Sequence, residues 1–473
     1  RGATSTFANG VRGALLGNYL NGGTPEVDIG VRGLTVAGNV VGSLFTFAGN
    51  LSGAGDLIKT GNSTLELLGT NTYQGDTEIR SVAASTTNTL RIGVYSASSG
   101  VGSVPVGASG GYGLLPATTR LGLVAFDSGT GGNVVFDLNG STQTVSALFS
   151  RNFNGTKIIN MGGGTINVDT QDGDSNGFYD GLFNGRGTVN VLGTRGAGWN
   201  IQDSVVSTSP PVNNNTSHIG DFNIQGGIVT LGGVNGSLGN TVHVTVNAPG
   251  RLIVSNSDIT GSLRGSGILT LDSGRTLTLT SAPKGAISSA PWTGTSNGAG
   301  NLVLANTARM MVKTNQGYTG RTTLQDRSEV ILDYSGAGVN NLIPGSFTMG
   351  GGTIRIVGGT NSTVETFTSN QTTLAQGATS IYGQASGARI NLGSMIRQRG
   401  SVLEIRGAGV LMANPGNESL GILGGYATTY GSGTNASAIT TWAIPNAASQ
   451  LVSGLLDTAY MTDFSALTVT NLD

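Results

Sequence analysis

The sequence contains no cysteine. This absence excludes disulfide bonds, thiol catalysis, covalent haem attachment and cysteine-based zinc sites. Charge is also scarce: charged residues make up 10% of the chain, and the formal net charge is -1, whereas about 25% charged residues is ordinary for a globular domain. We therefore expect no general attraction to nucleic acid or to an anionic membrane. No apolar run is long enough to predict a transmembrane helix.

Helical periodicity and imidazole groups are almost missing. The best helical pattern covers residues 448–457 and is interrupted by Gly454. The two histidines, His218 and His243, lie in different predicted strands or loops. Two imidazoles without cysteine predict neither a zinc site nor a general-base constellation.

Glycine is abundant, with 80 of 473 residues, or about 17% against a usual level of about 7%. Because glycine loses the most backbone entropy on folding, this enrichment indicates frequent corners, many with positive φ. Collagen is excluded, since glycine follows no three-residue period and proline numbers only 11. Hydrophobic residues reach 37% in short alternating runs, which argues against disorder. Solubility must then rest on Thr, Ser and Asn, and we expect ladders of small polar side chains between neighbouring coils.

Short strands bounded by Gly, Asn, Asp or Ser dominate the sequence, and one unit of them recurs. Residues 51–79 contain a Gly-x-Gly turn, two short strands, an Asn-Thr-Tyr-x-Gly corner and the start of a third strand. A weaker copy covers residues 298–324. A degenerate repeat of about 20 to 35 residues predicts an all-β solenoid with parallel strands, whose coils bury their apolar faces by stacking. Looser stretches at 81–118, 207–217 and 283–300 are interpreted as loop insertions.

The segment Leu51–Ile79 resembles the autotransporter-associated β-strand repeat. The matching residues are Gly53, Gly55, Leu57, Lys59, Gly61, Asn71, Thr72, Tyr73 and Gly75. This resemblance implies a right-handed parallel β-helix (a β-solenoid) that is secreted and displayed on a bacterial cell surface, with a structural or adhesive role.

We expect residues 1–473 to form a single β-solenoid. Because the chain opens at Arg1 without Met or a leader and stops at Asp473, we interpret it as a segment of a longer protein. Residues 425–473 look like the tails of very large repetitive bacterial surface proteins, and we treat them as a distinct junction or tail.

The sharpest local motif predicts a calcium loop, the one cofactor site proposed from the sequence. The side chains of Asp172, Asp174 and Asn176 form an Asp-x-Asp-x-Asn-Gly pattern. Phe178 would supply a backbone carbonyl, and Asp180 would supply the acid at the ninth position. The twelfth position is Phe183, so the bidentate Glu of an EF-hand is missing, and Asp169 would have to compensate from outside the loop. The alternative is a polar turn between two strands.

Catalytic residues are not predicted. The 25 carboxylates are scattered, and only the Asp169–Asp180 region gathers several, with Lys157 and Arg186 as the nearby bases. Four aromatic residues would stack on sugars if exposed, or fill corners: Trp199, Trp292, Trp442 and Tyr318.

Two functions follow from these observations. The first is a non-enzymatic, extracellular structural or adhesive β-solenoid that acts as a stiff spacer or fibre segment. Its partners would be neighbouring repeats, copies of itself or surface glycans. The alternative is a carbohydrate-binding or polysaccharide-cleaving β-helix.

Overall fold

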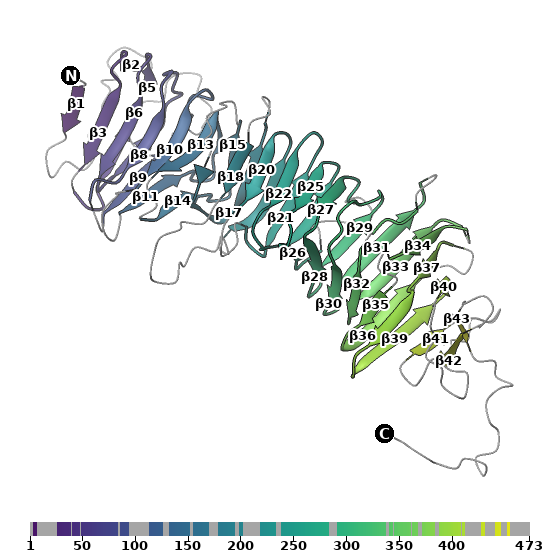
Figure 1. Cartoon of the computed structure of the whole chain (residues 1–473). Coiled ribbons are helices and arrows are strands. Elements are labelled where there is room, and N and C mark those ends of the chain that lie inside the picture. The colour runs from purple at the N-terminus through teal and green to yellow at the C-terminus, as the bar shows by residue number, and fades with distance from the viewer. Residues whose placement is uncertain are drawn as a thin grey trace, which may run out of the picture. The chain divides into compact units, whose positions relative to one another are not determined.

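The structure is a computed structural model, and it describes residues 3–6, 26–38, 40–47, 49–83, 86–93, 113–125, 132–151, 155–169, 178–193, 198–201, 218–232, 238–282, 291–336, 340–343, 345–360, 362–367, 371–383, 387–407, 409–411, 427–430, 440–445 and 452–454. In this part of the chain the regular structure is all β, with no helix, and parallel strands stack into a β-solenoid of about 12 turns (Figure 1). The predicted fold class is confirmed.

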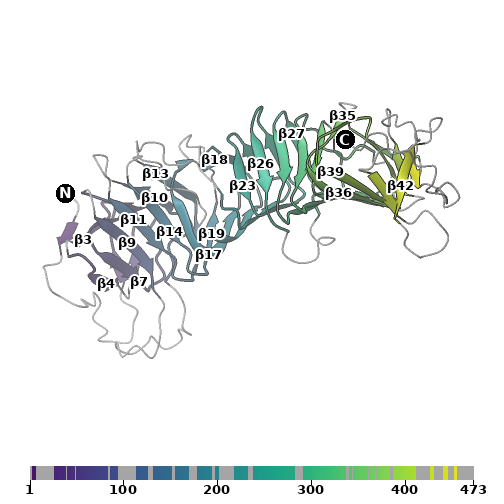
Figure 2. The same ribbon diagram turned by 90° about the horizontal axis from the view of Figure 1, so that it is seen from below.

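The chain divides into two compact units, Arg1–Lys284 with Thr293–Ala299, and Gly285–Trp292 with Gly300–Asp473. In the first unit, one sheet is formed in the order β1 (Ala3–Thr6), β3 (Leu34–Gly38), β6 (Leu57–Gly61), β8 (Thr77–Arg80), β10 (Arg120–Val124) and β13 (Ala147–Arg151). A second sheet runs from β4 (Leu44–Phe47) through β7 (Thr64–Leu67), β9 (Thr87–Ile92), β11 (Asn133–Asp137), β14 (Lys157–Asn160), β17 (Leu182–Val191), β19 (His218–Ile224) and β21 (Val242–Val246) to β24 (Ser262–Gly265). Its strands from β4 to β19 are labelled in Figure 2. Two further strands join it through β17, namely β12 (Thr142–Val145) and β15 (Thr165–Val168).

A third sheet of the first unit contains β16 (Phe178–Tyr179), β18 (Gly198–Ile201), β20 (Ile228–Leu231), β22 (Arg251–Val254), β25 (Ile268–Leu271) and β27 (Thr295–Gly298). Shorter pairs are β2 (Glu26–Asp28) with β5 (Asn50–Ser52), and β23 (Asp258–Thr260) with β26 (Thr276–Leu279). Each coil therefore contributes short strands to different sheets.

The second unit repeats this arrangement. One sheet contains β28 (Asn301–Leu304), β30 (Thr322–Gln325), β32 (Phe347–Gly350), β35 (Gln371–Leu374) and β38 (Ser394–Arg397). Another contains β29 (Arg309–Val312), β31 (Glu329–Tyr334), β33 (Thr353–Gly358), β36 (Gly377–Tyr382), β39 (Ser401–Arg406), β41 (Ala427–Tyr430), β42 (Thr440–Pro445) and β43 (Val452–Gly454). A third contains β34 (Val364–Thr366), β37 (Arg389–Asn391) and β40 (Gly409–Leu411).

Pairing changes direction near the end of the described chain. The pairs β41–β42 and β42–β43 are antiparallel. The weak helical pattern at residues 448–457 does not produce a helix where the structure describes it, since Val452–Gly454 forms β43. Ladder hydrogen bonds to β42 satisfy that backbone, and they override a weak helical periodicity.

The core of each unit is a stack of inward-facing columns. Side chains alternate between the interior and the surface along β6 and β7, as the period of two requires. Paired positions on successive coils then form an apolar column of buried side chains, Phe45, Leu65, Leu90, Phe136, Ile159 and Phe183. Burial accumulates coil by coil, and the structure needs no separate globular core.

The two predicted copies of the repeat share the same corner. The Tyr73 hydroxyl lies 2.5 Å from Thr77 Oγ1, and the Tyr318 hydroxyl lies 2.5 Å from Thr322 Oγ1. In the first copy the Asp76 amide donates to Asp56 Oδ1 over 2.8 Å. In the second, the Arg321 amide donates to Asn301 Oδ1, also over 2.8 Å.

Glycine is required where these corners touch. A Cβ atom at Gly75 would lie 2.5 Å from the Gly55 backbone, and one at Gly320 would lie 1.9 Å from the Gly300 carbonyl oxygen. Both contacts are too close for any other residue, so the coils approach one another here only because the side chain is absent.

The outer surface carries the expected polar ladder. Asn167 donates to Thr144, Asn190 donates to Asn167, and Asn223 donates to Asn190, over 3.1, 2.8 and 2.9 Å. The prediction that small polar side chains stack between coils is confirmed at these positions.

The interpretation of the looser stretches as insertions is partly wrong. Residues 81–118 include β9, which pairs with β7 and β11. Residues 283–300 include β27, which pairs with β25, and the fully buried Trp292. Glycine and serine in the flanking residues concealed these short strands. The stretch 207–217 lies outside the described residues.

Candidate functional site

The predicted calcium loop is only partly described. Asp172, Asp174 and Asn176 lie outside the described residues, Phe178 begins β16, and Asp180 follows that strand. In the described part of the chain, no group of three or more His, Cys, Asp and Glu side chains is placed to hold a metal ion. Calcium binding by this loop stays a prediction.

Asp180 itself is a buried partner of Lys157. Lys157 Nζ donates to Asp180 Oδ2 over 2.7 Å, and the Ser150 hydroxyl donates to Asp180 Oδ1. Burial lowers the pKa of the Lys157 ammonium, and the carboxylate of Asp180 opposes that shift. Because both side chains are almost completely buried, this lysine has no access to a substrate in solution. A calcium ion bound by Asp180 would have to compete with Lys157 and Ser150.

The histidines and aromatic residues occupy structural positions where their side chains are described. His243 Nδ1 lies 2.8 Å from the Ser262 hydroxyl, and His218 belongs to the neighbouring strand β19. The Trp292 indole donates to Gln316 Oε1 over 3.0 Å, and both Trp292 and Tyr318 are buried. These two aromatic residues fill corners and offer no platform to a sugar. Trp199 lies in β18 and Trp442 in β42.

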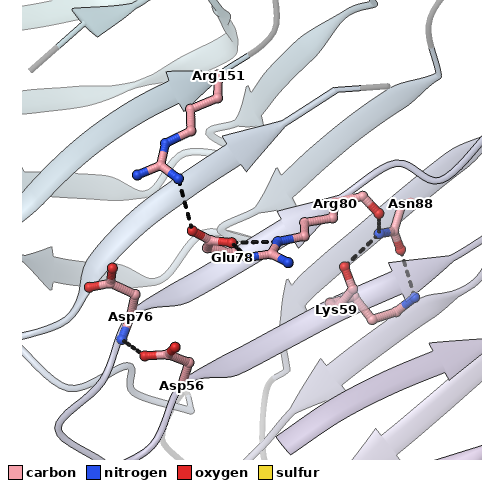
Figure 3. A network of polar contacts seen from close by, with 7 residues as sticks. All are labelled: Asp56, Lys59, Asp76, Glu78, Arg80, Asn88 and Arg151. Carbon is pink, nitrogen blue, oxygen red and sulfur yellow. Dashed lines mark hydrogen bonds and ion pairs between the residues drawn. The ribbon is translucent and has the colours of Figure 1, made fainter. Parts of the chain in front are cut away.

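A buried lysine that has no acidic partner among the described residues lies in the first unit, at the edge of the network in Figure 3. Lys59 Nζ donates to Thr60 O, Ser63 Oγ and Asn88 Oδ1 over 2.7, 3.2 and 2.6 Å. Asn88 in turn donates to the Lys59 and Arg80 carbonyl oxygens over 2.8 and 2.7 Å (Figure 3). Burial lowers the pKa of Lys59 to about 7. An amine with this pKa would be a competent general base, but Lys59 is 0% exposed, so its role is structural.

An ion-pair cluster lies on the outer face of the same sheet. Glu78 accepts from Arg80 Nε over 2.5 Å, and its other oxygen lies 4.0 Å from Arg151 (Figure 3). The guanidinium groups of Arg120 and Arg151 each lie 5.0 Å from the centre of the Phe149 ring. This arrangement covers the Phe149 ring, which is 3% exposed, and places two arginines, Arg80 and Arg151, beside the Glu78 carboxylate.

The second unit carries a similar cluster, and there it borders a concavity. The concavity has a volume of about 300 Å³ and is lined by Thr307, Arg309, Arg327, Glu329, Thr353, Arg355 and Tyr382. Glu329 accepts from Arg309 Nε over 2.5 Å and from Arg355 Nε over 2.7 Å. Its side chain is 9% exposed, whereas those of Arg309 and Arg355 are 41% and 46% exposed.

Tyr382 is held between two arginines. The Arg355 guanidinium carbon lies 5.5 Å from the centre of the ring, and that of Arg406 lies 5.1 Å from it. These arginines come from β33 and β39, which flank β36. Cation–π contacts from both neighbours hold the ring, and Tyr382 lines the concavity.

Strand register brings the cluster together, and for that reason the sequence analysis missed it. Arg309 pairs with Glu329 across β29 and β31, and Glu329 pairs with Thr353 across β31 and β33. These pairings join residues 20 and 24 positions apart, intervals equal to one coil each. The sequence did contain a signal for this cluster, namely arginine and glutamate residues spaced by about the length of one coil.

No family model, curated protein or solved structure matches this chain. The resemblance to the autotransporter-associated repeat therefore rests on the residues of the Leu51–Ile79 segment. The described part of the chain also contains no helix with the length and hydrophobicity needed to cross a bilayer.

Proposed function

We propose that this chain is a structural or adhesive segment of a secreted bacterial cell-surface protein, in which the β-solenoid acts as a stiff spacer. The role is non-enzymatic. The corner containing Asn71 and Tyr73 supports it, since Asn71 accepts from the Leu51 amide one coil away and the Tyr73 hydroxyl bonds to Thr77 within the corner.

One observation carries the proposal: continuous inward columns and parallel ladders link successive coils without any disulfide. Each ladder hydrogen bond contributes about 0.5–1.5 kcal/mol net, and their number grows with the number of coils. A structure stabilised in this way resists extension and tolerates sequence change on its outer face. Both properties suit a spacer that carries a binding surface away from a cell.

Localisation and mechanics test the proposal separately. Antibodies raised against the chain are expected to label intact cells of the source organism as strongly as permeabilised cells. Labelling only after permeabilisation would overturn the surface assignment. Stretching the full chain between its termini should give stepwise unfolding of groups of coils, whereas extension without resistance would contradict the spacer role.

The alternative is a carbohydrate-binding or polysaccharide-cleaving β-helix. For cleavage, the sequence offered Lys157 and the acids near it, but Lys157 and Asp180 are engaged with one another in the interior. Reproducible products from a polysaccharide depolymerisation screen would overturn the non-enzymatic role. Carbohydrate binding has a specific observation in its favour, the arginine-lined concavity of the second unit.

A further inference from the structure

We propose that the concavity lined by Arg309, Arg327 and Arg355 binds the carboxylate or sulfate groups of an acidic polysaccharide. This inference goes beyond the proposed spacer role, and its failure would leave that role standing. Three observations support it: an excess of positive charge, an arginine without a side-chain partner, and the backbone conformation of that arginine.

The charges that line the concavity do not balance. Arg309, Arg327 and Arg355 supply three cations, and Glu329 supplies the one carboxylate among the lining residues. Both oxygens of Glu329 already accept from Arg309 and Arg355. The exposed guanidinium groups keep further N–H donors for a ligand, and their planar geometry matches a carboxylate or a sulfate.

Arg327 is the arginine with no side-chain partner among the described residues. Its backbone amide donates to the Gly351 carbonyl oxygen over 2.6 Å, but its exposed guanidinium makes no hydrogen bond or ion pair with the described part of the chain. The side chain nevertheless lines the concavity together with Arg309 and Arg355. It therefore offers a complete set of five donors.

The turn that carries Arg327 has a conformation that favours glycine. Asp326 and Arg327 have φ values of 49° and 64°, and the Ser328 amide donates back to the Gln325 carbonyl oxygen. The same pair of left-handed residues in an equivalent turn is Asn139–Gly140, the preferred combination. Other turns closed by the same hydrogen bond also place a glycine with positive φ at the second turn position, the position of Arg327, as at Gly163, Gly274 and Gly400.

An arginine at this position therefore destabilises the fold slightly relative to glycine. A residue held in an unfavourable conformation, at the edge of a concavity, with its charge unpaired, indicates selection for binding. The polar lining identifies the ligand class. The hydroxyls of Thr307, Thr353 and Tyr382 suit sugar hydroxyl groups. A buried carboxylate at the centre and a net charge of -1 for the whole chain disfavour a densely charged polyphosphate.

The test compares two variants of the full chain that each remove one exposed turn arginine from the second unit. Arg327→Gly removes the proposed ligand contact. Arg399→Gly controls for the loss of an exposed turn arginine, since Arg399 is the first central residue of the turn closed by Ser401 and Gln398, has no positive φ and does not line the concavity. Binding is measured by calorimetry with polygalacturonate for carboxylates, dextran sulfate for sulfates, and neutral dextran and a single-stranded oligonucleotide as controls.

Two effects of opposite sign are expected from Arg327→Gly. Affinity for the acidic polysaccharide falls about tenfold or more, as the loss of a charged hydrogen-bond donor predicts. At the same time the melting temperature rises by about 2 °C, because glycine relieves the left-handed conformation. Arg399→Gly leaves the affinity within about twofold of that of the unchanged chain.

The preferred polysaccharide distinguishes a carboxylate site from a sulfate site, and either result supports the proposal. Three outcomes overturn it: no binding to either acidic polysaccharide, equal loss of affinity in the two variants, or equally tight binding of the oligonucleotide. A higher melting temperature with unchanged affinity would also overturn it, since Arg327 would then be only a suboptimal turn residue.

Discussion

Replacing Lys59 by methionine is expected to change how the stability of the chain depends on pH. Its ammonium group is fully buried, and its three hydrogen-bond acceptors, Thr60 O, Ser63 Oγ and Asn88 Oδ1, are all neutral. Burial without a counter-ion penalises the charged form, and it lowers the pKa of Lys59 from 10.5 to about 7.

The sign and size of the effect follow from this shift. Below pH 7 the amine is protonated in both the folded and the unfolded chain, and burying the charge weakens the fold. Between pH 7 and 10.5 only the unfolded chain keeps the proton, so the free energy of unfolding rises with pH. One pKa unit corresponds to about 1.4 kcal/mol, and the rise therefore reaches at most about 5 kcal/mol at the upper end of the range.

The assay is urea unfolding of the unchanged chain and of Lys59→Met from pH 6 to 10.5. Met cannot donate a hydrogen bond to Asn88. This loss lowers the free energy of unfolding of the variant by a similar amount at every pH. The difference between the two curves should therefore rise with pH above 7. Lys313→Met removes a half-exposed lysine paired with Asp333 and controls for the loss of a lysine as such. A difference curve for Lys59→Met that stays level across this range would refute the reasoning.

Three further measurements test other parts of the structure. Tyr318→Phe should destabilise the chain by about 1–3 kcal/mol and Tyr73→Phe by only about 1 kcal/mol. The smaller loss is expected because Thr77, the hydrogen-bond partner of Tyr73, keeps a second hydroxyl partner in Thr119. Chemical denaturation that gave the reverse order would contradict this. Lys157→Met leaves the Asp180 carboxylate buried and unpaired, so a loss of about 3–5 kcal/mol is expected; a variant with unchanged urea midpoint would show that Asp180 reaches solvent. The calcium hypothesis for residues 172–180 predicts a higher melting temperature in millimolar calcium, and an unchanged melting curve would reject it.

The fold could be predicted because it depends on local signals. The Asn-Thr-Tyr-x-Gly corner of Leu51–Ile79 specifies a turn that brings Gly75 onto Gly55, and alternation along β6 and β7 specifies which side chains face inward. Each of these two signals is carried by residues that are close together in the sequence. They are therefore visible in a sequence whose repeat is degenerate.

The arginine-lined concavity could not be predicted in the same way. Its residues are separated by whole coils, and coil length varies from one turn of the solenoid to the next. A change of one residue in any intervening loop would place Glu329 beside a different side chain. The conformation of Arg327 was equally hidden, because an Asp-Arg pair is not a sequence signal for two left-handed residues.

Buried polar pairs define the register between coils, which the apolar columns of a degenerate repeat leave poorly defined. Coils with similar apolar columns could stack out of register by one full turn at little cost in burial. Lys59 requires Asn88, Lys157 requires Asp180, and Glu365 requires the Tyr334 hydroxyl together with the Leu342 and Ile343 amides. The partners in each of these three cases lie 22 to 31 residues apart in the chain, so a displaced coil would leave a charged or polar group buried and unpaired. Losing one partner typically costs about 1–3 kcal/mol for a buried hydrogen-bonding group and about 3–5 kcal/mol for a buried ion pair. Exchanging one apolar side chain for another of similar volume typically costs less than about 1.5 kcal/mol. The inward polar residues thus discriminate between registers, and the outward columns remain free to vary and to carry binding sites.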